Sequence, residues 1–241
     1  MRISIVYMII GWLLSFNRLN AQNQMDQQIT LSPKQQSIVV ISALTAKGAL
    51  QKLPPALNTG LDAGLTVNEI KEVLVHLYAY CGFPRSIRGL QTFITVLDER
   101  KRKGITDKMG KEASPITGRE PKYERGKKVL EQLTGQPENG PKQGYSAFSP
   151  EIDVFLKEHL FADIFERDVL SYIDRELTTV SVLTSIGGVE PMLQSHLGIC
   201  LHVGLTEPQL RQAMLLIETN IGNTEAEAGR AILTQVTTSR K

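Results

Sequence analysis

Cysteine is scarce in this chain: its 241 residues include only Cys81 and Cys200. Two cysteines exclude a framework of several disulfides, and their wide separation excludes a Cys-x-x-Cys redox pair. The two thiols could still form one bridge. A lone cysteine in a helical protein is, however, most often a small apolar packing residue.

An excess of charge of one sign is also lacking, since 27 Lys and Arg residues stand against 25 Asp and Glu residues, for a net charge of +2. Nucleic-acid binding needs a stronger basic bias, so we predict no nucleic-acid partner. Histidine is scarce too, and the four histidines show no spacing typical of a zinc site. The sequence therefore predicts no bound metal.

The apolar run at residues 3–14 is shorter than the roughly 20 residues of a membrane-spanning helix, which predicts that there is no stable membrane anchor. The run follows Arg2 and precedes a polar stretch that ends at Ala21, which is the pattern of an export signal. We predict a signal peptide at residues 1–21 and a periplasmic or secreted mature protein. An uncleaved anchor is the alternative.

The alternating pattern of β-strands is absent, whereas apolar residues recur at intervals of three and four, which predicts an all-α fold. Ser32 is a predicted N-cap for a helix that ends near Lys47. Thr66 is another, for a helix over residues 67–81 that ends at Gly82, and Thr206 is the equivalent N-cap in the second half of the chain, for a helix that ends near residue 221. From Pro150, the spacing of Ile152, Phe155, Leu156, Leu160 and Phe161 predicts a further amphipathic helix.

The chain also contains an internal repeat. The tripeptide Gly-Leu-Thr occurs at residues 64–66 and 204–206, and matching positions continue on both sides at offsets of 140 and, upstream, 139. We therefore predict two tandem helical units, a first repeat at residues 30–103 and a second domain at residues 122–241. Between them lies a linker at residues 104–121 that is rich in glycine, proline and lysine.

Several segments resemble one known family. EIKEVLVHLYAYCGFP at residues 69–84 is similar to the signature helix of the carboxymuconolactone decarboxylase family, which is related to the alkylhydroperoxidase D-like proteins. In the second unit, YERG at residues 123–126, DRELTT at 174–179, and His196 through the tripeptide at 204–206 resemble other parts of the family pattern. The resemblance implies two tandem all-α bundles that associate as a homo-oligomer, here a trimer that imitates a hexamer.

The resemblance also implies a reaction, namely a carboxy-lyase activity on a small organic acid or lactone without a metal or organic cofactor. We expect an exported enzyme of this kind that works by acid and base catalysis. Two alternatives stay open. One is a peroxiredoxin-type activity that uses a single cysteine, Cys81 or Cys200, and the other is a non-catalytic oligomeric binding module.

Three polar residues of the first repeat are candidate catalytic groups. Glu72, His76 and Tyr80 are spaced by four, which places them on one helix face, where an acid and an imidazole could share a proton. The alternative is structural: Glu72 pairs with Lys71 or an arginine, and the two rings pack. The second repeat carries Gln212, Leu216 and Asn220 at these positions.

The resemblance adds Glu176 and His196 of the second repeat as an acid and a base, where the first repeat has Ser37 and Ala56. Each copy thus keeps a different half of the set, which predicts one composite site, within the chain or across subunits. A surface ion pair of Glu176 with Arg175 or Arg230 is the alternative. Arg85 and Arg88 are the candidate groups that bind the substrate acid, or else they are solvent-facing arginines.

Overall fold

The described part of the chain, residues 29–240 of a computed structural model, is helical and contains no strand. Its elements are α2 (Pro33–Lys47), α3 (Leu53–Asp62), α4 (Val67–His76), α5 (Tyr78–Arg102), α6 (Lys122–Thr134), α7 (Gly144–Phe148), α8 (Pro150–Phe155), the π-helix η1 (Leu156–Phe165), α9 (Tyr172–Ile186), α10 (Glu190–His202), α11 (Glu207–Asn220) and α12 (Asn223–Thr238). The predicted signal peptide lies outside the described residues. Within residues 29–240, none of the helices combines the length and apolar character needed to cross a membrane.

The predicted helix starts are confirmed. Ser32, Thr66 and Thr206 are each the N-cap of a helix with a reciprocal capping box. In the second of these, the Glu69 carboxylate accepts the backbone N–H of Thr66 at 2.6 Å and also pairs with Lys34 at 3.3 Å. A capping box satisfies backbone N–H groups that a helix leaves unpaired at its first turn.

The helix predicted over residues 67–81 is interrupted. A turn at Leu77 separates α4 from α5, and α5 itself has non-helical backbone at Gly82, with φ 82° and ψ 159°. The predicted break at Gly82 is therefore confirmed. Glycine suits this position because it adopts a positive φ without steric cost. The turn at Leu77 contains no glycine or proline, the residues that usually signal a helix break in a sequence.

The amphipathic helix predicted from Pro150 is only partly correct. The segment forms α8 and then the π-helix η1, and Phe155 is 64 % exposed. The buried positions include Leu160, Phe161 and Phe165. A π-helix bonds residue i to i+5, so the positions that share a face shift away from the α-helical spacing on which the prediction rested.

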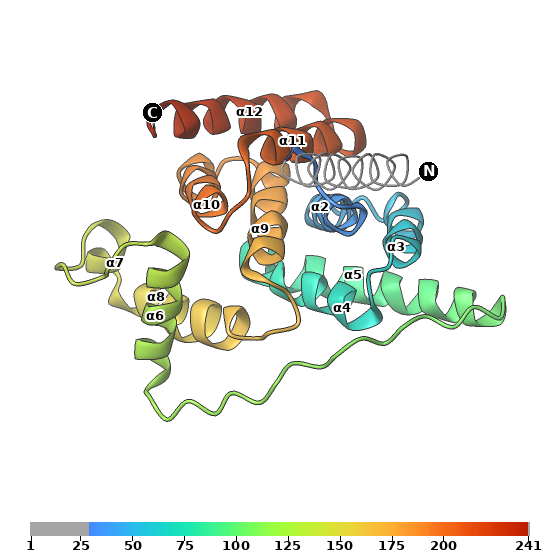
Figure 1. Ribbon diagram of the computed structural model, residues 1–241, viewed down its shortest axis with the longest axis horizontal. Helices are drawn as coiled ribbons and strands as arrows, with labels where there is room; N and C mark the ends of the chain where they lie inside the picture. Colours follow the sequence, from blue (N-terminus) through green and yellow to red (C-terminus); the bar gives the residue numbers. More distant parts are fainter. Residues whose placement is uncertain (1–28, 241) are drawn as a thin grey trace, which may run out of the picture.

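The two repeats fold around one hydrophobic core. α2 and α9 occupy equivalent places in the repeats and pack against each other in the centre of the molecule, with α3–α5 on one side and α10–α12 on the other (Figure 1). A single cluster of buried side chains joins residues of both repeats, among them Ile38, Leu74, Leu177 and Met214. Neither repeat buries its own core alone.

The internal repeat is visible in packing as well as in sequence. In each repeat a glycine of the last helix lies where an added Cβ would clash with a side chain of the third helix and a threonine of the first. These sets are Gly89 with Leu74 and Thr45, and Gly229 with Met214 and Thr184. The members are related by the offsets of 140 and 139, so the structure reproduces the register of the repeat.

α6 and η1 precede only the second repeat among the described residues, and they pack closely at one end of the molecule (Figure 1). Their contact has its own apolar cluster, which includes Val129, Leu133 and Phe165. The linker at residues 104–121 is non-helical and runs along the outside of the molecule. It is held at α4, because the backbone N–H of Asn68 donates to the Met109 carbonyl at 2.9 Å.

Gly126 of α6 gives a direct test of the α6–η1 contact. A Cβ at this position would lie 1.7 Å from the backbone carbonyl oxygen of Lys157, so one of the two helices must move. We expect Gly126→Ala to lower the free energy of unfolding by about 1–3 kcal/mol, as overpacking does. Urea unfolding followed by circular dichroism measures it.

Gly198 of α10 is the matched control, because it is also a helical glycine and a Cβ there meets nothing within 4 Å. Gly198→Ala should leave stability unchanged or raise it by up to about 1 kcal/mol through helix propensity. Equal stability of the two variants would contradict the close contact.

Candidate active site

The candidate residues of the two repeats meet inside one chain. Tyr80 of α5 lies between two histidines, with ring centroids 5.4 Å from His76 of α4 and 5.6 Å from His196 of α10. Glu72 and Glu176 border the same group through the contacts described below. The composite cluster is therefore intramolecular in this structure.

A buried ion pair joins the repeats at this point. Arg175 of α9 is completely buried, and its Nη2 donates to Glu72 Oε1 at 2.8 Å. Arg167, from the segment before α9, donates from Nε and Nη2 to the same carboxylate at 2.8–3.1 Å. Burial alone would raise the pKa of Glu72, but hydrogen bonds and charge from the two guanidinium groups outweigh it and hold the pKa below its usual value.

The contacts of His76 define its tautomer. Arg175 Nη1 lies 3.2 Å from His76 Nδ1, and since a guanidinium can only donate, Nδ1 accepts. His76 Nε2–H then donates to Thr179 Oγ1 at 2.9 Å, and that hydroxyl donates to the Arg175 carbonyl at 3.0 Å. Burial, with the positive charge of Arg175 next in importance, lowers the pKa of His76 well below its usual value. His76 is therefore neutral and has both ring nitrogens engaged.

This arrangement corrects one sequence-based hypothesis. Glu72 and His76 do share a helix face, but the Arg175 guanidinium binds both of them and takes the place of a direct acid–imidazole hydrogen bond. Of the two structural alternatives for Glu72, pairing with an arginine is the one present. Lys71 instead donates to Asn68 at 3.1 Å.

A second acid and imidazole do form a direct pair. His196 Nδ1–H donates to Glu176 Oε2 at 2.9 Å, with the Glu176 side chain completely buried and the His196 side chain 13 % exposed. Glu176 thus forms neither of the surface ion pairs that were its alternative, and Arg230 pairs with Glu218 at 2.7 Å. Because Nδ1 carries the proton in this bond, the Nε2 lone pair is available, and no other residue in the described range binds it.

Three polar atoms around this pair are buried without a hydrogen-bond partner in the described part of the chain, namely Tyr80 Oη, Arg175 Nε and Glu176 Oε1. Burial, and secondarily the charge of Glu176, raises the pKa of Tyr80 against smaller opposing effects of the nearby Thr179 hydroxyl and of Arg175, so its hydroxyl is neutral and can donate. Buried polar groups in proteins are nearly always paired. Two unused donors next to a free imidazole nitrogen are suited to a ligand that carries an oxygen acceptor.

Arg85 and Arg88, the predicted substrate-binding residues, are both exposed on α5. The Arg85 guanidinium packs over Gly48, and Arg88 donates to Gln91 at 2.7 Å. The cations next to the candidate catalytic groups are instead Arg167 and Arg175. Sequence analysis missed them as site residues, although Arg175 lies directly before Glu176 and a buried acid requires a partner.

The two cysteines are free thiols in environments that disfavour the thiolate. Burial raises the pKa of Cys81 to about 11, against a smaller opposing effect of Arg85. Cys200 is completely buried, which raises its pKa well above the usual value. A peroxidatic cysteine needs a lowered pKa, because the thiolate is the nucleophile.

The remaining histidines have other partners. His159 Nδ1 lies 3.3 Å from Asp163 on the exposed side of η1, and the His202 ring packs over Gly135. In the range 29–240, no three side chains of the types that ligate metals are grouped around a common point.

The ion pair makes Glu72 a residue on which stability depends. Replacing it with glutamine leaves the charge of Arg175 buried and only partly compensated, so we expect Glu72→Gln to lower the free energy of unfolding by about 3–5 kcal/mol. Chemical denaturation measures the loss. Glu218→Gln, which removes one partner of a partly exposed pair, should cost less than about 1 kcal/mol. Similar losses in the two variants would contradict the special role of the Glu72 contact.

The comparisons with known proteins agree with the duplicated architecture. A search of curated proteins found no match. The model of the carboxymuconolactone decarboxylase family matches the chain twice, at residues 18–93 and 150–235, which together cover more than half of it. The first match ends within α5, and the second runs from the start of α8 into α12, so that each covers most of one repeat. The chain therefore belongs to the carboxymuconolactone decarboxylase family, as a member with two tandem copies of the domain.

Proposed function

We propose that this protein is a cofactor-independent enzyme that transfers a proton at a carbon atom of a small organic acid or lactone, with His196 as the acid and base. The observation that supports this most directly is the His196–Glu176 hydrogen bond of 2.9 Å, which leaves His196 Nε2 available near the Tyr80 ring. A carboxylate on Nδ1 orients an imidazole and stabilises its protonated form.

A decarboxylation at this site balances with one proton. The bond between carbon and the carboxylate breaks, carbon dioxide leaves, and the electron pair stays on the carbon, delocalised into a neighbouring carbonyl as an enolate. Protonated His196 then donates the Nε2 proton to that carbon, and Glu176 stabilises the imidazolium beforehand. The imidazole regains a proton from solvent, so the net reaction consumes one proton.

The unpaired donors supply the electrostatic part of the mechanism. Tyr80 Oη–H and Arg175 Nε–H are buried and have no partner in residues 29–240, so an enolate oxygen would be their acceptor. Fixed donors in a dry site stabilise developing negative charge strongly, because they need no reorganisation during the reaction. In this proposal Glu72 and His76 are positioning residues, which hold the Arg175 guanidinium in place.

Access to the site favours small substrates. Phe165 of η1 lies edge-on against His76 with ring centroids 5.0 Å apart, whereas the His196 side chain is 13 % exposed and Tyr80 is also partly exposed. The enzyme hypothesis requires that the polar side chains converge, as they do here. The hypothesis of a non-catalytic binding module predicts that they are buried. Turnover decides between them.

The two cysteines give little support to the peroxidase alternative. Both thiols have raised pKa values because they are buried, and neither is paired with a histidine or an acid in the described residues. The proton-transfer proposal therefore takes precedence over the alkylhydroperoxidase-like activity.

The proposal is tested by turnover of small lactone acids, including carboxymuconolactone, with carbon dioxide release as the measurement. We expect His196→Ala to lower kcat by about 10²–10⁴-fold, as loss of a general acid or base does. Glu176→Gln and Tyr80→Phe should lower kcat by at least about tenfold. His159→Ala, which removes the exposed histidine of η1, should leave kcat unchanged.

Melting temperature and molar mass accompany each assay, so that a loss of folding is not mistaken for a loss of chemistry. Unchanged turnover in His196→Ala would end the proposed mechanism. An absence of turnover on every lactone acid, with all variants folded, would favour the binding module.

We also propose that copies of the chain associate through α5. Its outer face exposes Phe83, Ile87 and Ile94, at 61 %, 48 % and 59 %. The equivalent positions of α12, at an offset of 140, are Asn223, Glu227 and Thr234. An apolar face that only one of the two copies retains is typical of a protein–protein contact.

Substituting one residue on each face separates the two surfaces. We expect Ile94→Glu to reduce the molar mass measured by light scattering, because a buried carboxylate at the contact is costly. Thr234→Glu, at the equivalent position of α12, should leave the molar mass unchanged. A monomeric wild-type protein, or an equal effect of both variants, would contradict an α5 interface.

A further inference from the structure

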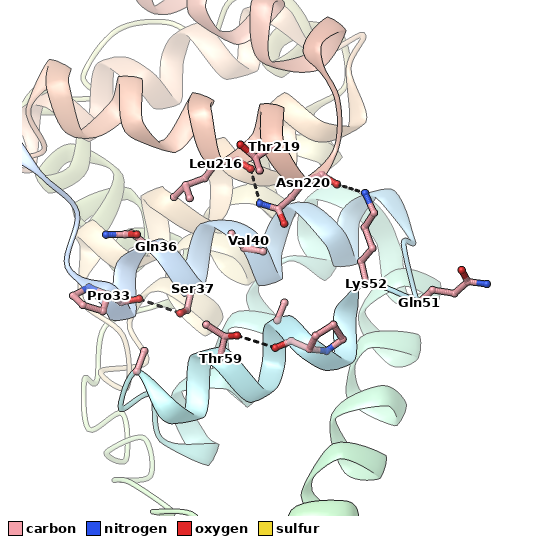
Figure 2. Close-up of a pocket in the computed structure, with 13 residues that line it drawn as sticks. Pro33, Gln36, Ser37, Val40, Gln51, Lys52, Thr59, Leu216, Thr219 and Asn220 are labelled. Atoms are coloured by element: carbon pink, nitrogen blue, oxygen red, sulfur yellow. Dashed lines mark hydrogen bonds between the residues drawn. The ribbon is translucent and has the colours of Figure 1, made fainter.

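A cavity lies in the half of the duplicated core that does not contain the composite cluster. This cavity, of about 640 Å³, opens between α2, α3 and α11. Figure 2 shows Leu216 and Asn220 of α11 above α2, and Thr59 of α3 below it. This volume is within the usual range for small-molecule sites.

The cavity is the counterpart of the composite cluster in the other half of the repeat. Six of its lining residues stand at the positions equivalent to the cluster: Gln36 for Arg175, Ser37 for Glu176, Val40 for Thr179, Ala56 for His196, Leu216 for His76 and Asn220 for Tyr80. The replacements remove an arginine, an acid, two histidines and a tyrosine. Most of the new side chains are smaller, which accounts for the open volume here.

Three polar side chains of the cavity each use one donor in a bond within the chain. The Ser37 hydroxyl donates to the Pro33 carbonyl at 3.0 Å, and the Asn220 amide donates to the Leu216 carbonyl at 2.8 Å (Figure 2). The Gln36 amide likewise donates to the Leu31 carbonyl at 2.8 Å. What remains for a ligand is the oxygen of each group, which accepts, together with the second N–H of each of the two amides.

One charged residue lines the cavity, at its edge. Lys52 is exposed, and its Nζ donates to the Asn220 carbonyl at 2.9 Å (Figure 2). The other lining residues are uncharged, and several are apolar, such as Val40, Pro55 and Leu216. A carboxylate placed in the interior would face these acceptor oxygens and lose its hydration without meeting a positive charge in return.

We propose that this cavity is a second, non-catalytic binding site for a small, uncharged and largely apolar molecule that carries a hydrogen-bond donor, of the class of phenols and alcohols. The donor binds the free oxygens of Ser37, Gln36 or Asn220, and the apolar body packs on Val40, Ala56 and Leu216. The duplication thus yields one site whose chemistry suits an acid and another whose chemistry excludes one.

Calorimetric titration of the full chain with phenol and with benzoate tests the proposal, because the two probes share a ring and differ in donor and charge. We expect phenol to bind with one site per chain, and benzoate to bind this cavity at least about tenfold more weakly. Ala56→Trp fills the cavity and should abolish phenol binding. Asn220→Leu, which removes an acceptor and keeps the branched shape of the side chain, should weaken it by about threefold to tenfold, the effect of one hydrogen bond.

Two further variants place the binding. His196→Ala, in the composite cluster, should leave phenol binding unchanged, and Lys52→Gln should leave the preference for phenol over benzoate unchanged. Circular dichroism of each variant confirms that it is folded. The proposal is wrong if Ala56→Trp binds phenol normally while folded, if benzoate binds the cavity as tightly as phenol, or if phenol does not bind because another part of the chain or a second copy fills the cavity.

Discussion

The buried ion pair between Glu72 and Arg175 is the contact on which the candidate site depends. It connects the two repeats, and its charges cannot be left alone, because an unpaired buried charge costs several kcal/mol. Arg175 also binds His76 Nδ1, and through the Thr179 hydroxyl the other nitrogen of that ring is engaged as well. One guanidinium thus connects α4 to α9, and burial together with its charge keeps His76 neutral.

The pair also divides the polar residues into two groups with different tasks. Glu72 and His76 are saturated with partners, which suits them to hold Arg175 and leaves them no free lone pair for proton transfer. Glu176 and His196 form a simpler pair with an open nitrogen, beside two donors that lack acceptors in the described residues. The spacing of four along one helix predicted Glu72 and His76 as catalytic groups. The contacts instead favour Glu176 and His196 in that role.

Duplication explains how such a site can arise from two similar units. The copies share a core built around α2 and α9, so each half of the molecule has a space where residues of both repeats meet. In one space the charged and aromatic residues are retained, and α6 and η1 cover it. In the other, small and uncharged residues leave an open cavity. The same scaffold therefore offers two environments of opposite chemistry.

The sequence by itself determined the all-α class, several helix caps and the register of the repeat, because capping boxes, positive-φ glycines and apolar spacing are local signals. The local sequence correctly predicted three N-caps, Ser32, Thr66 and Thr206, and the helix break at Gly82. The repeat, taken together with the family resemblance, also predicted a composite site, since each copy lacks the residues that the other keeps.

Only the tertiary structure decided which polar groups meet. Arg175 and Glu72 are 103 residues apart, and no local pattern reveals that a guanidinium would stand between Glu72 and His76. The exposure of Arg85 and Arg88 and the turn at Leu77 likewise depend on packing between helices. Burial sets charge state and partner choice, and burial is a property of the assembled core that a spacing of four along one helix cannot express.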